Sequence, residues 1–261
     1  MRLRPVLRTL SELCVTAGAL IVLFVVYVLY WTGLRADSAM DSEIDHLRDR
    51  WAAGPAAAPD RPPQPPQPQQ DRQPEQPQQQ PPEHQQDQAG PPPAQERPAA
   101  PDAPRPEGRA FAVMYVPRFG ADWAKPVLEG TGTELLKRGL GHYGHSAAPG
   151  AVGNFAVAGH RRTYGDPFKD LPRLREGDAV LLTDGATWFT YRVDGRPYVT
   201  RPDDVGVVDP VPAGSPYRDA GRYLTLTTCE PEWGHSKRLV VWAHLETTRP
   251  AVRGETGASP G

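Results

Sequence analysis

One cysteine in the C-terminal half of the chain has the surroundings that a catalytic thiol needs. Cys229 ends the strand-like run YLTLTTC and precedes Glu230, so it lies where a strand gives way to a loop. A cysteine nucleophile reacts as the thiolate, and it needs a proton-transfer partner and a donor for the oxyanion. The alternative is that Cys229 is a buried small hydrophobic residue, which residue type alone favours.

Two other residues are suited to be these partners. His160 follows the small apolar run FAVAG and precedes the polar run RRTYG, so it occupies the same strand-end position as Cys229. Arg238 comes nine residues after Cys229 and begins the apolar run LVVW. If the intervening loop folds back, Arg238 lies beside Cys229 on the adjacent strand. A guanidinium there stabilises a thiolate and an oxyanion together.

Two separate segments resemble the signatures of one enzyme family. The run LTLTTC at 224–229, followed by RLVV at 238–241, resembles the TLxTC…R signature of the sortases. The stretch from GHY at 141–143 to AGHR at 158–161 is similar to the family's other signature, which ends in its catalytic histidine. The sequences AGHR with TYG, and TTCEP, are most similar to the class E enzymes of actinobacteria. The resemblance covers about residues 113–245.

This resemblance implies an all-β fold, a closed eight-stranded barrel with short helices, and a transpeptidase. Such an enzyme cuts a C-terminal sorting signal, LAxTG-like or LPxTG-like, between Thr and Gly. By the resemblance, Cys229 is the nucleophile that forms a thioacyl intermediate. His160 protonates the leaving amine and then deprotonates the incoming one, and Arg238 stabilises the oxyanion. The implied partners are proteins that bear sorting signals and an amine of the cell-wall precursor.

Other residues near the site receive weaker assignments. Thr228 is expected to help hold the substrate, and Tyr115 to line the signal groove, with simple packing as the alternative for Tyr115. Glu230 and Glu232 follow Cys229 closely, and we interpret them as loop solvation because a carboxylate opposes thiolate formation. A thiolate–imidazolium pair predicts a bell-shaped dependence of rate on pH.

No metal and no cofactor is predicted. His142 and His145 have a His-x-x-His spacing, but no further ligands are nearby in the sequence. His235 and His244 replace His160 as the base only if His160 points away from the thiol.

Short β-branched runs bounded by Gly, Pro or Asp predict the strands that position these residues. Strands are expected near residues 110–116, 154–159, 179–183, 188–193, 198–200, 222–228 and 239–246. The sequence TDGA between the third and fourth runs predicts a hairpin, and short helices are expected at 132–138 and 167–174. About 140 residues with seven or eight strands and little helix indicate a single barrel or sandwich.

Composition excludes several classes of protein. The net charge is −2 and no basic stripe is present, so nucleic acid is not a predicted partner. Only two cysteines occur, Cys14 in an apolar run and Cys229, which excludes a disulfide framework. Residues 54–108 hold 18 of the 32 prolines and no aromatic residue. Such a segment cannot build a core, and a disordered spacer is predicted.

The N-terminal region predicts a membrane anchor. Residues 13–31 carry no charge, and 19 residues at about 1.5 Å each span about 28 Å, close to the hydrocarbon thickness of a bilayer. A cleaved signal peptide is the alternative. Arg2, Arg4 and Arg8 precede this run and acidic residues follow it. The positive-inside rule therefore predicts a single-pass membrane protein with a cytoplasmic N-terminus and a catalytic domain facing the cell wall.

The predicted organisation divides the chain into six segments. They are a cytoplasmic N-terminus (1–12), the transmembrane helix (13–31), a juxtamembrane stalk (32–53) with a short exposed helix near 36–51, the linker (54–108), the catalytic domain (109–246) and a disordered tail (247–261). Two alternative functions stay open at this point. One is a cysteine peptidase that releases peptides to water, and the other is a non-catalytic surface β-domain with an inert Cys229. A cysteine L,D-transpeptidase is disfavoured because its Ser-His-Gly-Cys type of motif is absent.

Overall fold

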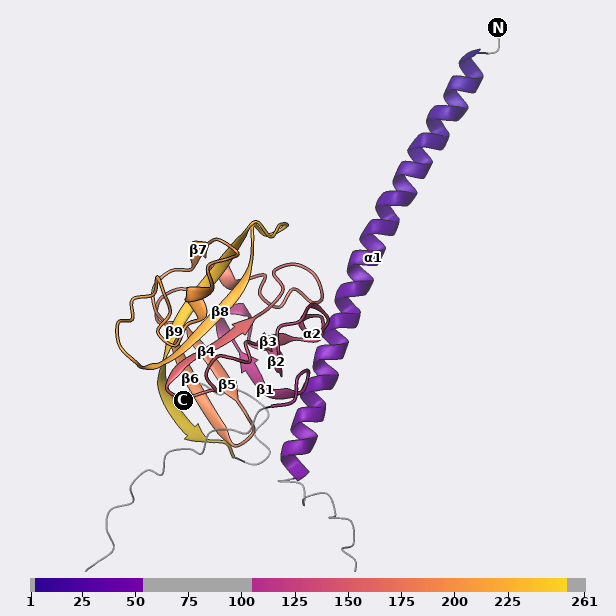
Figure 1. Ribbon diagram of the computed structural model, residues 1–261. Coiled ribbons are helices and arrows are strands. Elements are labelled where there is room, and N and C mark those ends of the chain that lie inside the picture. Colours follow the sequence, from indigo (N-terminus) through magenta and orange to yellow (C-terminus); the bar gives the residue numbers. More distant parts are fainter. Residues whose placement is uncertain (1–2, 54–104, 253–261) are drawn as a thin grey trace, which may run out of the picture. The chain divides into compact units, whose positions relative to one another are not determined.

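The computed structural model describes residues 3–53 and 105–252, and Figure 1 shows the arrangement of the strands. The strands are β1 (Ala110–Tyr115), β2 (Ala124–Glu129), β3 (Leu140–His142), β4 (Gly153–Ala158), β5 (Ala179–Thr183), β6 (Thr187–Val193), β7 (Tyr198–Thr200), β8 (Arg222–Glu230) and β9 (Lys237–Pro250). The helices are α1 (Leu3–Ala53), α2 (Thr133–Leu136) and the 3-10 turns η1 (Pro117–Phe119), η2 (Leu171–Arg173) and η3 (Val205–Val208).

Eight of the strands close into a barrel. The order is β6-β5-β1-β2-β3-β4-β8-β9, and a further pairing of β6 with β9 closes it. β7 pairs with residues 238–240 of β9, on the same edge where β6 pairs with residues 243–250. β2 with β3 and β4 with β8 are parallel, and the remaining pairs are antiparallel. The prediction of a closed eight-stranded barrel is confirmed.

Side chains alternate between the barrel interior and its outer face, as strand geometry requires. Leu224 and Leu226 of β8, and Leu239 and Val241 of β9, lie in the interior core. The residues between them face outward, where η3 covers part of the wall. The buried apolar residues on this side form what we call the outer cluster: Ala156, Val207, Val208, Val240 and Trp242.

Several predicted boundaries differ from the structure. β2 and β3 were not expected, because β2 contains a proline in AKPVLE and β3 has only three residues. The predicted disordered tail is wrong for residues 247–250, which continue β9 and pair with β6 as far as Thr187↔Pro250. The predicted helix at 167–174 contains only the turn η2. Residues 253–261 lie outside the described part of the chain.

The helix expected near residues 36–51 is present within α1, but the prediction that it is exposed is wrong. Its residues Ala36, Met40, Ile44 and Leu47 recur at helical spacing and are buried. Ile44 and Leu47 join a cluster with outward-facing residues of β1, β2, β5 and β6, which include Val113, Leu128, Leu181 and Trp188. Many charged residues separate these apolar positions in the sequence, so the pattern did not indicate a buried face. Two of these charges pair with the barrel, Asp37 with Lys125 at 2.9 Å and Glu43 with Arg138 at 2.8 Å.

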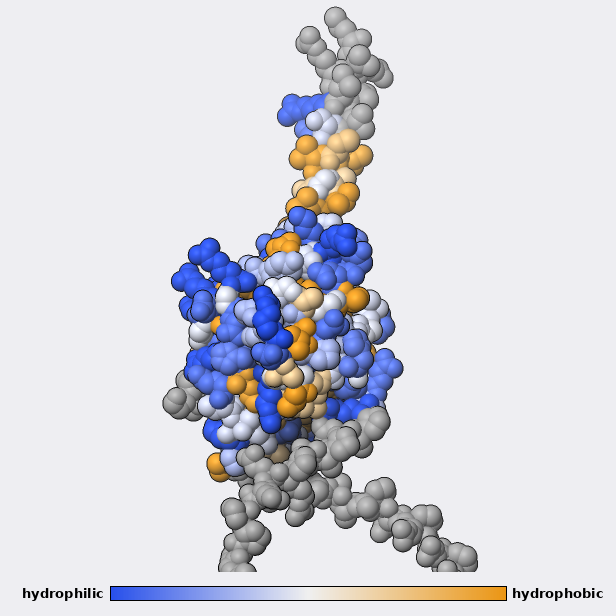
Figure 2. Space-filling model, turned by 60° about the vertical axis from the view of Figure 1, so that its left-hand side comes forward, coloured by the Kyte–Doolittle hydropathy of each residue, from blue (hydrophilic) through white to orange (hydrophobic). Residues whose placement is uncertain are grey.

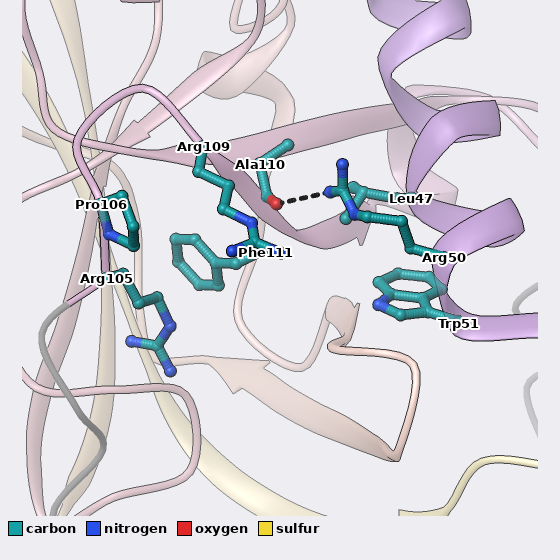
Figure 3. Close-up of a pocket in the computed structure, with 8 residues that line it drawn as sticks. All are labelled: Leu47, Arg50, Trp51, Arg105, Pro106, Arg109, Ala110 and Phe111. Atoms are coloured by element: carbon teal, nitrogen blue, oxygen red, sulfur yellow. Dashed lines mark hydrogen bonds between the residues drawn. The ribbon is translucent and has the colours of Figure 1, made fainter. Parts of the chain in front are cut away.

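The two segments that flank the predicted linker contribute to one small cavity of about 250 Å³ (Figure 3). Leu47, Arg50 and Trp51 come from α1, and residues 105, 106 and 109–111 come from the start of the barrel. Arg50 donates a hydrogen bond to the carbonyl oxygen of Ala110 at 3.0 Å. The chain therefore leaves α1 and enters the barrel at the same place. Residues 54–104, most of the predicted linker, lie outside the described residues.

The apolar part of α1 exposes large hydrophobic side chains from Leu13 to Tyr27, which Figure 2 shows gathered along the helix. Among the residues that the structure describes, no helix combines the length and the apolar character needed to cross a membrane. The predicted span of residues 13–31 includes residues 28–31, whose side chains lie outside the described set.

Candidate active site

Three neighbouring strands bring the predicted catalytic residues to one level. Cys229 of β8 and Arg238 of β9 are direct register partners. On the other side of β8, Ala158 of β4 is level with Thr227, so continuing the parallel register by two residues places His160 beside Cys229. Adjacent strands lie about 4.8 Å apart. His160 and Arg238 therefore flank the thiol on its two sides.

These three residues also share one face of the barrel wall. Directly opposed residues of an antiparallel pair project to the same side. Arg238 lies two residues before Val240 of the outer cluster on β9, so the two side chains face the same side of the wall. His160 lies four residues after Ala156 on the continuation of β4 and therefore faces that side as well. The backbone keeps its ladder beyond β4, since the amide of Gly159 donates to the carbonyl of Thr227 at 3.1 Å. The site therefore opens on the outer face.

The thiol and the guanidinium are both accessible. Cys229 is a free, half-buried thiol. Arg238 donates from its Nη1 to the carbonyl oxygens of His235 and Lys237 at 3.2 and 3.1 Å, which holds the guanidinium at the end of the β8–β9 loop. None of the ion pairs among the described residues involves Arg238. Its charge is therefore available to stabilise an anion on the thiol or on a bound carbonyl.

His160 is held in a half-buried position by the loop that follows it. Its ring lies 5.3 Å from the ring of Tyr164, and Lys137 Nζ lies 5.3 Å from the centre of that tyrosine ring. Burial lowers the pKa of His160, and the nearby charge of Lys137 lowers it further. The imidazole is therefore biased toward its neutral form. Its Nε2 is buried, and none of the described residues forms a hydrogen bond with it.

The loop after His160 stores backbone strain. Thr163, Tyr164 and Asp166 have φ of 107°, 52° and 48°, a region that residues other than glycine rarely occupy. The Asp166 carboxylate stabilises the turn by accepting hydrogen bonds from the Thr163 amide at 2.6 Å and from Arg162 at 3.0 Å. Strained conformations of this kind persist where the surroundings enforce them, and they cluster at functional sites.

Two arginines fasten the histidine loop to the loop after the nucleophile. Arg161 pairs with Glu230 at 2.7 Å, and its Nη1 also approaches the carbonyl oxygen of Cys229 at 3.4 Å. Arg162 pairs with Glu232 at 3.2 Å. Our interpretation of Glu230 and Glu232 as loop solvation is therefore wrong. Because arginines compensate both carboxylates, these groups do not oppose a thiolate on Cys229.

Comparison with known proteins identifies the family. A model of the Sortase domain matches residues 114–246, just over half of the 261 residues. The chain belongs to the sortase family. Members of this family are cysteine transpeptidases built on the closed barrel described above.

The similar proteins include class E sortases, which confirms the subclass that the sequence resembles. The chain is 32% identical to sortase SrtE1 of Streptomyces coelicolor over 258 residues, which cover 96% of this chain but only 60% of that protein. The structure of sortase E from Streptomyces avermitilis is 66% identical, covers 56% of this chain and 93% of its own, and superposes with a TM-score of 0.53. The structure of sortase E1 from S. coelicolor, solved with a tripeptide in its active site, is 37% identical to this chain. It covers 57% of this chain and 94% of its own, and it superposes with a TM-score of 0.54.

Thr228 links β8 to the segment that carries His160. Its side chain is only 3% exposed, and its hydroxyl donates to the carbonyl oxygen of Gly159 at 2.8 Å. This bond joins the residue before the nucleophile to the residue before His160. The predicted contact between Thr228 and the substrate is not what the structure favours, because the hydroxyl is buried and occupied.

The structure does not bring Tyr115 to the site. Val113 and Tyr115 face outward from β1 into the cluster beneath α1, and the Tyr115 ring lies 5.4 Å from that of Trp188. β1 pairs with β2 and β5, whereas Cys229 lies on β8 between β4 and β9. The alternation of β1 thus directs Tyr115 to packing rather than to the signal groove.

The rival histidines have other surroundings. The Nδ1 of buried His142 lies 2.9 Å from the Glu129 carboxylate, so this side chain is part of the barrel's structure. His244 lies 2.8 Å from Asp194 and is six residues along β9 from Arg238, about 20 Å away. His235 is exposed in the β8–β9 loop. Within residues 3–53 and 105–252, no group of three or more ligand residues forms a metal site.

The sequence reasoning missed the ion pairs that the arginines 161 and 162 form beside the site. The two arginines directly follow His160, as two glutamates follow Cys229 within three residues. Once the two strand ends are placed side by side, opposite charges at matching positions predict ion pairs. These charges are visible in the sequence, but predicting the ion pairs requires knowing that β4 and β8 pair in parallel.

Proposed function

We propose that this chain is a membrane-anchored sortase that joins proteins with a C-terminal sorting signal to an amine of the cell-wall precursor. The observation that carries the proposal is the placement of His160, Cys229 and Arg238 at one level and on one face of three adjacent strands. This arrangement supplies the proton carrier, the nucleophile and the oxyanion donor of a cysteine acyl transfer.

In the first step, the Cys229 thiolate attacks the carbonyl carbon of the signal's threonine. The carbonyl oxygen becomes an oxyanion beside the Arg238 guanidinium, which stabilises it. The C–N bond to glycine then breaks, and protonated His160 gives its proton to the leaving amine. The products are a thioester on Cys229 and a free C-terminal fragment.

In the second step, an acceptor amine attacks the thioester carbonyl. Neutral His160 takes a proton from the attacking nitrogen, the C–N bond forms, and the C–S bond breaks to return the thiolate. The lowered pKa of His160 suits this step because burial and the charge of Lys137 favour the neutral ring.

The sorting signal would lie on the outer face next to the three residues. Ala156 and Val240 of the outer cluster lie on the same face, but both side chains are fully buried. The half-buried Cys229 and Arg238 are the accessible groups there, which supports binding of the signal with its threonine carbonyl at Cys229.

Membrane anchoring rests on the sequence. Residues 13–31 carry no charge, arginines precede them and acidic residues follow, which favours a single-pass helix with the barrel outside the cytoplasm. Membrane fractionation followed by protease treatment of intact cells and of lysed cells tests this. Release of the chain without detergent, or digestion of the barrel only after lysis, would contradict the assignment.

The catalytic proposal is tested with a labelled sorting peptide, with and without an acceptor amine. The wild-type chain should form a peptide–amine adduct, and mass spectrometry should detect the acyl group on Cys229. Cys229→Ala should abolish cleavage, and His160→Ala and Arg238→Ala should lower it by at least about 100-fold. Cleavage without any adduct would indicate a peptidase. A native thiol that reacts with a small electrophile only after unfolding would indicate a non-catalytic domain.

A further inference from the structure

A large cavity adjoins the catalytic residues from the opposite side of the barrel wall. It has a volume of about 1040 Å³, and the residues that directly follow the histidine, the cysteine and the arginine of the site line it: Arg161, Glu230 and Leu239. Successive residues of a strand face opposite sides. The site and the cavity therefore lie on the two faces of the same three backbone segments, and they meet where β8 ends, one residue after Cys229.

The cavity is basic. Five of its lining residues are arginines: Arg118, Arg161, Arg173, Arg175 and Arg196. Two lining residues are acidic, Glu176 and Glu230. Asp178 and Asp170 pair with Arg118 and Arg173 from outside the lining, so five positive and four negative side chains leave an excess of one positive charge. We call this hollow the arginine cavity.

Part of this charge is available to a ligand. The Arg161 side chain is only 8% exposed, and although it pairs with Glu230, its Nε is buried and has no hydrogen-bond partner in the structure. Arg118 is paired with Asp178. Arg196 is exposed, and none of the ion pairs among the described residues involves it. A buried guanidinium with an unused donor is costly unless a ligand or water completes its hydrogen bonds.

We propose that the arginine cavity binds the acceptor through carboxylate groups that this amine carries, and that it presents the amine to the thioester on Cys229. The inference rests on the proposed sortase activity and adds the location and the chemistry of its second substrate. While the acyl donor occupies the outer face, the acceptor has to approach from another side. The arginine cavity opens onto the same strand end.

The positive charge of the cavity favours binding of the acceptor's carboxylate and also favours the neutral form of its amine. Guanidinium groups bind carboxylates through paired hydrogen bonds, which lysines do not provide. The same positive charges disfavour the ammonium form of a bound amine, so they increase the fraction that is neutral and nucleophilic. That neutral nitrogen forms the new C–N bond as the C–S bond breaks, and its proton passes to His160.

Two amines that differ only in one carboxylate test the proposal, namely triglycine and triglycinamide. In an extended tripeptide the amine and the carboxylate are about 10 Å apart, so a bound carboxylate leaves the amine at a distance from the arginines that hold it. The full-length chain is assayed with a labelled sorting peptide, and adduct formation is measured against amine concentration. We expect kcat/KM to be at least about fivefold higher for triglycine, and to fall toward the triglycinamide value as salt is added.

Arg196→Gln and Arg175→Gln should remove most of this preference, lowering kcat/KM for triglycine about three- to tenfold while triglycinamide changes by less than twofold. Peptide cleavage without amine reports the first step, which these changes should leave intact. Arg201→Gln is the matched control, since Arg201 is an exposed arginine outside the cavity, 3.3 Å from Asp203. It should behave as wild type.

The outcomes separate the two proposals. Equal kcat/KM for the two amines in the wild-type chain, or an equal loss for both in Arg196→Gln, would overturn the role of the arginine cavity while cleavage of the peptide continued. Loss of preference in Arg201→Gln as well would show a general charge effect and would also overturn it. Absence of peptide cleavage in the wild-type chain would instead count against the sortase activity itself.

Discussion

The ion pair between Arg161 and Glu230 can be broken from either side, and the two changes should affect the neighbouring thiol in opposite directions. Arg161→Met leaves an uncompensated carboxylate one residue from Cys229, which disfavours the thiolate. Glu230→Gln leaves an uncompensated guanidinium whose Nη1 lies 3.4 Å from the Cys229 carbonyl oxygen, which favours the thiolate. Both variants lose the 2.7 Å pair.

The expected magnitudes follow from burial and distance. The Arg161 side chain is 8% exposed and that of Glu230 26%, so the pair is mostly buried. Removing one partner of a buried pair costs about 3–5 kcal/mol, and partial exposure of Glu230 reduces this to about 2–3 kcal/mol, or about 4–12 °C in Tm. An uncompensated charge next to Cys229 contributes on the order of 1 kcal/mol at this partly exposed position, which corresponds to a severalfold change in the reactivity of the thiol.

Thermal unfolding and the rate of Cys229 alkylation by iodoacetamide at one fixed pH measure these effects. The alkylation rate should fall severalfold in Arg161→Met and rise severalfold in Glu230→Gln. Arg192→Met is the control, because it breaks a more exposed pair with Glu246 at 2.7 Å on β6 and β9. It should cost less than about 1 kcal/mol and leave the alkylation rate unchanged. Rate changes in the same direction in both test variants would refute the electrostatic argument.

Three further predictions concern groups around the site. Lys137→Gln should raise the pKa of His160 by removing a positive charge, so the acidic limb of kcat/KM against pH should move to higher pH; an unmoved limb would contradict the influence of Lys137. Thr228→Val should lower the free energy of unfolding by about 1–2 kcal/mol, because it leaves the Gly159 carbonyl without its buried donor. In this variant kcat should fall several-fold more than KM changes. Thr228→Ser should restore the rate. Met40→Ala should weaken the packing of α1, so amide hydrogens of residues 36–51 should exchange faster while those of β8 stay protected; equal protection in wild type and variant would contradict the packing.

The parts of the fold that the sequence predicts are those in which local signals and long-range packing agree. β5 was placed at its observed bounds because it is a β-branched run next to a hairpin turn. β2 was missed because Pro126 interrupts its pattern, and the strand forms only because β1 and β3 pair with its two edges. β9 continues to Pro250 for the same reason, since its polar C-terminal end pairs with β6. Pairing partners far away in sequence are not visible in a local pattern.

The predictions for the site residues divide in the same way, into those that rest on local signals and those that depend on long-range packing. The strand-end positions of Cys229 and Arg238 predicted that they lie side by side, and the register confirms it. The roles of Thr228 and Tyr115 depend instead on which way each side chain faces. Tyr115 turns outward into a cluster that exists only because α1 covers it, and an exposed helix had been expected there. The packing of Tyr115, which was the alternative to a place in the groove, therefore depends on the docking of α1.

The covering of the barrel by α1 also changes the meaning of the linker. A Pro-rich segment of 51 residues, 54–104, reaches up to about 160 Å when extended. Trp51 and Arg105, on the two sides of this segment, line the same cavity, so its length does not separate the barrel from α1 while α1 is docked. In the docked state only four residues, 32–35, lie between the proposed membrane span, which ends at residue 31, and the first buried residue, Ala36. The linker can act as a spacer only in molecules whose α1 has left the barrel. For the proposed membrane-anchored enzyme, the distance of Cys229 from the membrane while α1 is docked is set by the apolar stripe of α1 and its two ion pairs, and not by the length of the proline-rich segment.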